Sequence, residues 1–288
     1  MSQKRAVAKM IQCRPVIEGA GVHLNRVFGF GDTESFDPFL LLDDFRSGDP
    51  EKFLPGFPWH PHRGIETITY MLEGSVKHGD SMGNSGCIGK GDVQWMTAGS
   101  GIIHQEMPKG DDRNRMGGFQ LWANLPASHK MMPPRYREVK STDIPAVTVD
   151  HDVTVRIIAG EVNGVSGPVG AIVTEPEYLD VTMAPDSVFI RDISVEHNVF
   201  AYMIEGSAYV DNHDEESVSN GTLVLFGDGE QVAVTTRKQS ARLLLISGKP
   251  LREPVAWQGP IVMNTREELQ TAFEEYANGT FIRHHPQD

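Results

Sequence analysis

The chain has 288 residues, enough for two domains of ordinary size or one large one, and a formal net charge of −13. A surface this acidic repels phosphate backbones, so we expect no direct binding to nucleic acid. Only two cysteines occur, Cys13 and Cys87, and no apolar run approaches the length of a membrane helix. These features exclude a disulfide framework, a cysteine-rich zinc site and a membrane span. Because the first residues also lack a signal peptide, we expect a cytoplasmic protein.

Short apolar or alternating runs follow one another along the chain, each bounded by Gly, Pro, Asn or Asp. They lie at 39–42, 66–72, 93–96, 119–122, 153–158, 199–204, 223–226 and 241–246. Their length and their content of β-branched and aromatic residues are typical of strands. With 29 glycines and 18 prolines as punctuation, the pattern predicts an all-β protein, a sandwich or a barrel.

The sequence also predicts one helix, near 265–278. Thr265 and Glu268 have the spacing of a capping box, in which each side chain bonds the backbone of the other residue. Apolar residues then recur on one helical face, at positions 269, 272, 273 and 276, and Gly279 ends the helix. We expect this helix to pack against a barrel and to take no part in catalysis.

An internal repeat indicates two similar domains. The sequence YMLEGS at 70–75 recurs as YMIEGS at 202–207, and each copy is followed by a glycine turn and an apolar run. The repeat predicts two β-barrels in tandem, joined in the polar stretch around 138–145. We therefore assign residues 1–140 to the first barrel and residues 141–288, with the helix, to the second.

Two histidine-rich pairs stand out as candidate metal ligands. His60 and His62 are separated by one residue, and about forty residues later His104 and Glu106 repeat that spacing. Side chains at i and i+2 of a strand point to the same face, so we expect the first pair to open a strand and both pairs to face one barrel interior. Three neutral nitrogens and one carboxylate form a complete ligand set for a divalent transition metal. A histidine-lined surface cleft is the alternative.

Ligand types alone leave the metal open among Fe(II), Mn(II), Ni(II), Cu(II) and Zn(II). An octahedral ion with four protein ligands keeps two open positions, whereas four-coordinate zinc would close the site. The repeat offsets of 132 and 130 residues carry the four ligand positions onto residues that do not form such a set, namely Asp192, Ser194, Val234 and Thr236. We therefore expect the second barrel to bind no metal.

Several longer stretches resemble the pirin family of the cupin superfamily over nearly the whole chain. They are FPWHPHRGIETITYMLEGSVKHGDS, GDVQWMTAGSGIIHQEMP, GGFQLWANLP and REPVAWQGPIVMNTREELQTAFEEY. The resemblance implies two cupin (jelly-roll-like) barrels, with iron bound in the amino-terminal barrel only by His60, His62, His104 and Glu106. The general cupin pattern places its carboxylate ligand near Glu66. In pirins the carboxylate follows the last histidine, so Glu66 is assigned a supporting or structural role.

The resemblance also implies an activity. Some pirins open flavonols such as quercetin with dioxygen and release carbon monoxide, and here Glu106 would take the proton of the flavonol 3-hydroxyl. One alternative is dioxygenase action on another enol or a diketone. The other is a non-catalytic, redox-responsive iron protein that acts on a protein partner, as a transcriptional co-regulator or an inhibitor of a metabolic enzyme. A deep apolar cavity beside the metal would favour a substrate, and a sealed site a regulator. We expect a monomer.

A few other residues admit two interpretations. Asp43 and Asp44 end an apolar run, where a strand-end turn is favoured over support of a histidine. Phe57, Trp59 and Trp95 are candidates for a flat aromatic pocket, with core packing as the alternative.

Overall fold

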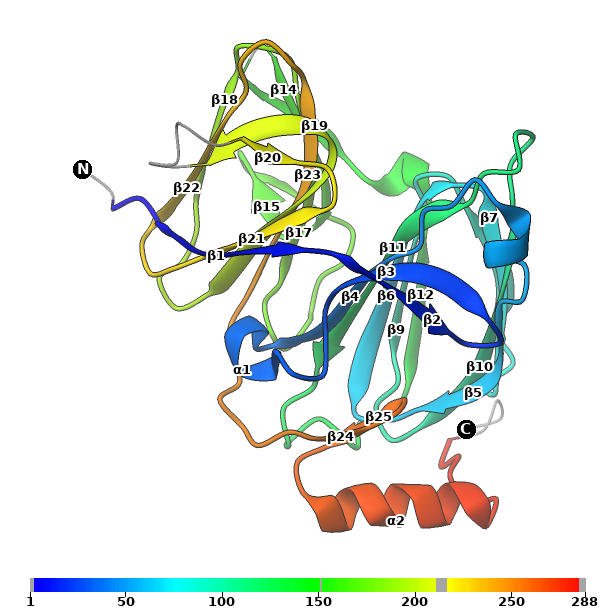
Figure 1. The fold of residues 1–288 in the computed structure, drawn as a ribbon. Helices are drawn as coiled ribbons and strands as arrows, with labels where there is room; N and C mark the ends of the chain where they lie inside the picture. The colour runs from blue at the N-terminus through cyan, green and yellow to red at the C-terminus, as the bar shows by residue number, and fades with distance from the viewer. Residues whose placement is uncertain (1–2, 151, 211–216, 285–288) are drawn as a thin grey trace. The chain divides into compact units, whose positions relative to one another are not determined.

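The computed structural model describes residues 3–150, 152–210 and 217–284. These residues form two compact units. The first barrel unit contains Arg14–Glu34, Pro38–Ser141 and the described chain from Leu251 onward. The second barrel unit contains the described chain up to Cys13, residues 35–37 and Thr142–Pro250. Each unit is a β-barrel, as the punctuated apolar runs predict, and every one of the eight expected runs lies in a strand (Figure 1).

The first barrel is made of two antiparallel sheets. The larger has the order β12 (Arg135–Val139), β9 (Val93–Thr97), β6 (Ile65–Glu73), β11 (Gly117–Asn124), β4 (Phe39–Asp44), β3 (Val22–Phe28) and β2 (Arg14–Glu18). The smaller has the order β5 (Phe57–His62), β10 (Ile102–Lys109), β7 (Ser75–Asp80) and β8 (Ser85–Gly89). A hairpin of β24 (Ala256–Gln258) and β25 (Ile261–Met263) and the helix α2 (Arg266–Ala277) complete this unit.

The second barrel repeats this strand order. Its main path is β1 (Val7–Gln12), β21 (Thr222–Phe226), β19 (Asn198–Val210), β23 (Ala241–Gly248), β17 (Glu177–Met183), β14 (Val153–Ala159) and β13 (Ala146–Asp150). The long strand β19 also pairs with β20 (Val218–Ser219) and with β22 (Gln231–Thr235), which pairs with β18 (Val188–Asp192). The remaining short elements are α1 (Thr33–Phe36), β15 (Glu161–Val162), β16 (Val165–Ser166) and the 3-10 turns Pro50–Lys52 and Ser141–Asp143.

The two units differ at both termini from the contiguous division 1–140 and 141–288. Strand β1 pairs with β21 of the second barrel and holds the place that β12 holds in the first. An open strand edge leaves backbone amides and carbonyls without hydrogen-bond partners. Strand β1 supplies the partners for this edge of β21. At the other end, the Val262 amide donates to the Arg63 carbonyl (3.1 Å), and the Arg63 guanidinium donates to the Phe281 carbonyl (2.9 Å). The C-terminal hairpin and helix therefore belong to the first barrel unit.

Helix α2 begins as the capping box predicts. The Thr265 hydroxyl accepts from the Glu268 amide at 3.1 Å, and the Glu268 carboxylate accepts from the Thr265 amide at 3.1 Å. Gly279 follows the last turn with φ = 73°, a left-handed conformation that ends helices. Leu269 and Ala272 are buried on the inner face of the helix, where they pack with Ile261, Met263 and Phe281.

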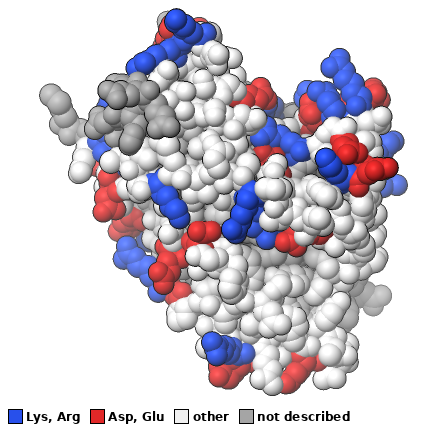
Figure 2. Space-filling model, viewed as in Figure 1, with Lys and Arg blue, Asp and Glu red and all other residues white. Residues whose placement is uncertain are grey.

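Both barrels bury apolar side chains. Those inside the second barrel form one continuous cluster. Buried apolar residues of the first barrel include the clusters around Ile65 and Ile102 and around Met71 and Ile88. On the face shown in Figure 2, acidic and basic side chains are interspersed, with wide uncharged areas between them. Among the described residues, no helix is both long and apolar enough to cross a membrane.

Candidate metal centre

Strands β5 and β10 bring the histidines together. The strands pair antiparallel, with His104 opposite His60 and Ile102 opposite His62. The prediction that His60 and His62 open a strand is wrong, because they end β5 and the next strand begins at Ile65. Gly64 makes the turn between them with φ = 79°, and a Cβ there would lie 1.9 Å from the Val262 carbonyl oxygen. Only glycine fits this turn.

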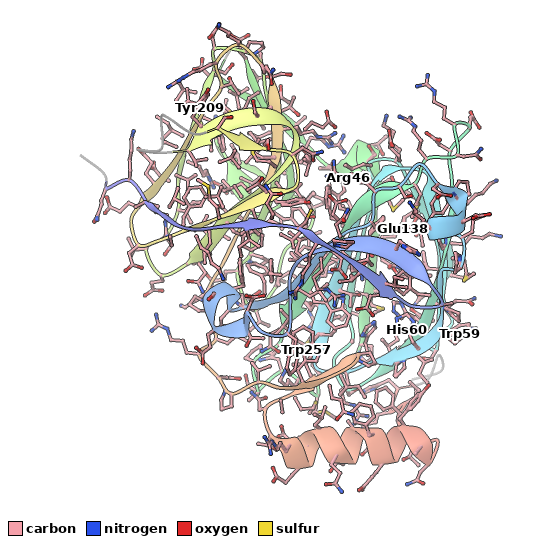
Figure 3. The ribbon with its side chains drawn as sticks, viewed as in Figure 1. Arg46, Trp59, His60, Glu138, Tyr209 and Trp257 are labelled. Carbon is pink, nitrogen blue, oxygen red and sulfur yellow. The ribbon has the colours of Figure 1, made fainter. Side chains whose placement is uncertain are left out.

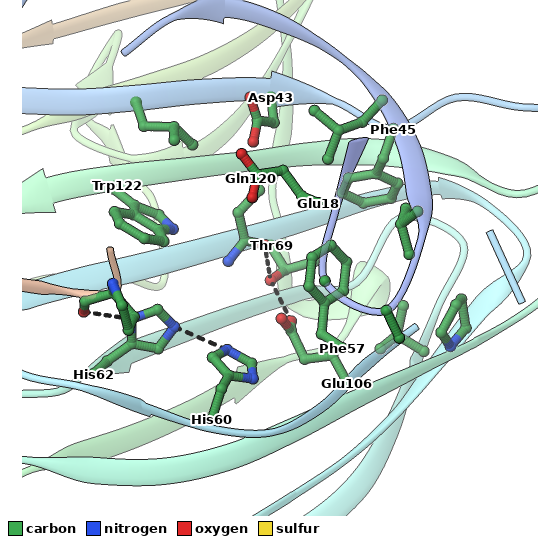
Figure 4. Close-up of a pocket in the computed structure, with 18 of the residues that line it drawn as sticks. Glu18, Asp43, Phe45, Phe57, His60, His62, Thr69, Glu106, Gln120 and Trp122 are labelled. Atoms are coloured by element: carbon green, nitrogen blue, oxygen red, sulfur yellow. Dashed lines mark hydrogen bonds between the residues drawn. The ribbon is translucent and has the colours of Figure 1, made fainter. Parts of the chain in front are cut away.

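The three imidazoles form a compact cluster. One nitrogen of each of His60, His62 and His104 lies within 4.8 Å of the other two, in the part of the chain that the structure describes. His62 and His104 are buried, at 2% and 1% exposure, and His60 is half-buried. Figure 4 shows His60 and His62 side by side at the base of a pocket, joined by the short contact between their rings.

Backbone carbonyls set the tautomers of two of these histidines. Nδ1 of His60 lies 2.8 Å from the Pro58 carbonyl oxygen, and Nδ1 of His62 lies 3.0 Å from that of Pro260. A carbonyl can only accept, so both Nδ1 atoms carry protons and both Nε2 atoms present lone pairs. The two Nε2 atoms are 3.1 Å apart. Two nitrogens bound to one metal at about 2.0–2.1 Å each have a separation of this order.

Burial keeps the cluster neutral, as metal ligation requires. Desolvation first, and the neighbouring imidazoles second, lower the pKa of His62 to about 3 and that of His104 well below its ordinary value. Desolvation also lowers the pKa of His60. Nε2 of His104 is buried and has no hydrogen-bond partner among the residues that the structure describes. An unpaired buried nitrogen is costly, and a cation among the three Nε2 atoms would satisfy it. The residues therefore fit a divalent metal.

Glu106 lies on the same strand, two residues after His104. Its carboxylate Oε1 is 3.2 Å from the Thr69 hydroxyl, which is also 2.7 Å from Oε1 of Gln120. Desolvation raises the pKa of Glu106 to about 7, and the hydrogen bond from Thr69 opposes this shift. The compact histidine cluster does not include this carboxylate among the described residues. Its role as fourth ligand stays a prediction, as does the absence of metal from the second barrel.

A cavity of about 620 Å³ opens beside the cluster within the first barrel unit. His60, His62 and Glu106 line it, and most of its remaining wall is apolar and aromatic. Figure 3 shows Trp59 next to His60, and Trp257 on the segment that precedes α2. The volume falls in the range of small-molecule sites. Of the three aromatic residues left open above, Phe57 and Trp59 line this cavity, whereas Trp95 is 1% exposed and lies in the core.

Other candidates occupy different places. Glu66 accepts a hydrogen bond from Thr97 and does not line the cavity, in agreement with a structural role. The strand-end turn expected of Asp43 and Asp44 is confirmed for Asp44, which ends β4 and accepts from the Arg46 amide (3.1 Å). The same expectation is wrong for Asp43. It lies within β4, lines the cavity and pairs with Arg26. Arg26 and Glu18 also line the cavity. No sequence motif marks these two residues, because they lie on separate strands.

Comparison with known proteins identifies the family. Family models described as Pirin and as the Pirin C-terminal cupin domain match residues 21–123 and 178–282. A pirin-like protein of Caulobacter vibrioides is 44% identical over 278 residues, 96% of this chain and 99% of that protein. A Pseudomonas aeruginosa protein provisionally named quercetin 2,3-dioxygenase is 40% identical over 283 residues, 97% of this chain and 99% of its own length.

A solved structure agrees with these matches. The crystal structure of quercetin 2,3-dioxygenase from Acinetobacter baumannii has a TM-score of 0.88 and 30% sequence identity, over 96% of this chain and 98% of that one. The histidine-bearing strands β5 and β10 lie inside the first family match. The chain belongs to the pirin family of two-barrel cupins.

Proposed function

We propose that this protein is a mononuclear metal dioxygenase that opens flavonols such as quercetin with dioxygen and releases carbon monoxide. The observation that carries the proposal is the cavity of about 620 Å³ that His60, His62 and Glu106 share with aromatic walls. A deep, mostly apolar cavity beside the ligand set is what a flat aromatic substrate requires. The names of the Pseudomonas and Acinetobacter relatives point to the same substrate class.

The metal ligands in this proposal are His60, His62, His104 and Glu106, and the metal is Fe(II). Mn(II), Ni(II), Cu(II) and Zn(II) have ligand preferences compatible with the same four side chains. When bound, the metal supplies Lewis acidity and a route for electrons between substrate and dioxygen. The carbonyls of Pro58 and Pro260 hold the rings of His60 and His62 in the tautomer that ligation needs.

Glu106 is the proposed catalytic base. Its carboxylate lines the cavity, so it can reach a substrate hydroxyl, and the Thr69 hydroxyl holds it in place. A raised pKa brings a carboxyl closer to the value at which it can take and return a proton near neutral pH. Phe57 and Trp122 form apolar walls that exclude water and favour a planar ligand.

Oxygen uptake tests the proposal. Protein loaded with Fe(II) without oxygen is mixed with oxygenated buffer and quercetin, with His62→Ala as the matched control. We expect uptake that follows flavonol loss in the wild type and is absent in the control. We also expect Glu106→Gln to retain some metal but to lose turnover by about 10²–10⁴-fold, the usual contribution of a general base.

Two results would contradict the proposal, the first the dioxygenase activity itself and the second the role of Glu106. One is the absence of uptake by protein with iron shown to be bound, which would favour the redox-responsive regulator. The other is full turnover by a metal-loaded Glu106→Gln protein, which would remove Glu106 from the chemistry.

A further inference from the structure

Four polar residues lie in register across the inner face of the large sheet of the first barrel. Arg26 on β3 is opposite Asp43 on β4, Asp43 is opposite Gln120 on β11, and Gln120 is opposite Thr69 on β6. All four line the cavity. We call them the polar row. Residues directly opposite on neighbouring antiparallel strands point to the same face, so the row forms one continuous polar strip.

The second barrel holds an apolar row at the corresponding positions. Its strands β14, β17, β23 and β19 pair in the same order, and the residues in register are Ile157, Leu179, Leu245 and Ala201. These four residues belong to the buried core of that barrel. The fold therefore does not need polar side chains at these positions. An apolar set often replaces a buried polar or charged pair without loss of stability, so the polar row in the first barrel indicates a use beyond the fold.

The Arg26 end of the row is rich in hydrogen-bond acceptors. Arg26 donates from Nε to Oδ1 of Asp43 (2.9 Å) and from Nη2 to Oδ2 (2.8 Å), and its Nη1 lies 2.9 Å from the Glu18 carboxylate. Asp43 is 5% exposed and lines the cavity. A carboxylate has about four acceptor positions, and the two bonds from Arg26 use two of them. Two carboxylates against one guanidinium leave this end net negative.

This end is separated from the histidines by the rest of the row. In Figure 4, Asp43 and Glu18 lie on one side of Gln120 and Thr69, and His60 and His62 lie on the other. Gln120 uses one amide atom for Thr69, and its other amide atom, drawn as the nitrogen, faces the pocket. A ligand that reaches both ends would meet metal ligands at one end and acceptors at the other.

We propose that the Arg26–Asp43 pair is a specificity-determining subsite, in which Asp43 accepts hydrogen bonds from hydroxyl groups on the end of the ligand remote from the histidines. Arg26 is a positioning residue, because it orients the carboxylate. An acceptor-rich, net negative subsite selects hydroxyl donors and rejects carboxylates, phosphates and methyl ethers. The inference rests on the proposed function in one respect, namely that the ligand is a hydroxylated aromatic molecule.

Ligand binding without oxygen tests the inference separately from turnover. Quercetin and 3-hydroxyflavone, which lacks every hydroxyl except the one at position 3, are titrated into anaerobic Fe(II)-loaded protein, with Trp122 and Trp257 as fluorescent reporters in the cavity wall. We expect the wild type to bind quercetin at least about tenfold more tightly than 3-hydroxyflavone. This is the effect of one hydrogen bond to a charged group. The Arg26→Ile/Asp43→Leu variant copies the residues of the second barrel. It should bind the two flavonols within roughly threefold of each other.

A matched control exists in the second barrel. Arg242 donates to Asp180 through Nε (2.9 Å) and Nη2 (2.7 Å), the same bidentate geometry, and neither residue lines the cavity. Arg242→Ile/Asp180→Leu should therefore keep the full preference for quercetin. If the first double variant does not fold, Asp43→Asn gives a second measurement. This substitution replaces the carboxylate by a neutral amide of the same shape, so the preference for quercetin over 3-hydroxyflavone should fall at least about threefold.

The outcomes separate the two proposals. If both flavonols bind and the Arg26→Ile/Asp43→Leu and Asp43→Asn proteins keep the wild-type preference, the subsite is wrong and the dioxygenase proposal is unaffected. If neither flavonol binds the wild type, both proposals fail. If the preference is lost in the variants while oxygen uptake is absent in the wild type, the subsite stands and the chemistry does not.

Discussion

In the first barrel, strands β4, β11 and β6 present Asp43, Gln120 and Thr69 to a cavity of about 620 Å³. In the second barrel, the corresponding strands β17, β23 and β19 present two leucines and an alanine to a continuous apolar core. The strand order is the same in both. The pair β5 and β10, which carries the histidines, likewise corresponds to β18 and β22, whose sequences VFIRD and QVAVT contain no histidine.

The difference teaches that strand order and interior chemistry are set independently in this fold. The backbone hydrogen bonds of a sheet do not depend on which side chains face inward, so one strand order accepts either filling. Apolar filling stabilises the second barrel by burial. In the first barrel, buried charges must find partners, which Arg26 supplies for Asp43. Substitutions that carry a feature of one barrel into the other test this independence most directly.

The largest effect is expected from placing a carboxylate in the second barrel. Leu179 is fully buried, and its register equivalent in the first barrel is Asp43. Leu179→Asp would bury a charge without the arginine that Asp43 has. We expect the free energy of unfolding, measured by urea denaturation, to fall by roughly 4 kcal/mol or more. Leu179→Met, a control of similar volume, should cost less than about 1.5 kcal/mol. A similar small loss for both would show that this core admits water.

Apolar substitutions in the first barrel distinguish the loss of the whole Arg26–Asp43 pair from the loss of one partner. Asp43→Leu alone leaves Arg26 with Glu18 as its partner and should destabilise the protein by roughly 2–4 kcal/mol. Arg26→Ile/Asp43→Leu removes both charges and should be close to neutral or stabilising, because an apolar pair often replaces a buried ion pair without loss. The measurement is a double-mutant cycle of unfolding free energies. Additive single effects would contradict the coupling.

Stability should also depend on pH through Asp43. Burial raises its folded-state pKa from 3.8 to about 6, although Arg26 opposes the shift. A folded state that binds the proton more tightly than the unfolded state is stabilised below the unfolded pKa. We expect this stability, at most about 3 kcal/mol, to be lost as the pH rises from about 4 to about 6. Unfolding curves over this range should show the slope in the wild type. Its persistence in Arg26→Ile/Asp43→Leu would assign it to another group.

The smallest effect concerns the helix that the first barrel has and the second lacks among the described residues. Thr265→Ala removes the N-cap of α2 and should cost about 1 kcal/mol. Hydrogen exchange should quicken in α2 and β25 and stay unchanged in β23 of the second barrel. Thr265→Ser keeps the capping oxygen and is the control. Faster exchange in both barrels would show that the helix stabilises more than its own unit.

Local patterns in the sequence determined the strands, the helix and the histidine cluster. The capping box of Thr265 and Glu268 and the i, i+2 spacing of His60 and His62 are each decided by a few neighbouring residues. Backbone geometry gives such spacings a direct meaning, because alternation along a strand and recurrence along a helix do not depend on distant residues. The pirin motifs contain the same short-range information.

Tertiary structure alone decided what surrounds the histidines. His62 is oriented by the carbonyl of Pro260, 198 residues away in the chain, and the first strand of the sequence completes the second barrel. Asp43 faces the cavity because β4 lies between β3 and β11, where Arg26 and Gln120 are its cross-strand neighbours. Pairing between distant strands follows from the whole arrangement of the sheet. No local pattern contains it, and so the polar row is visible only once the strands are placed side by side.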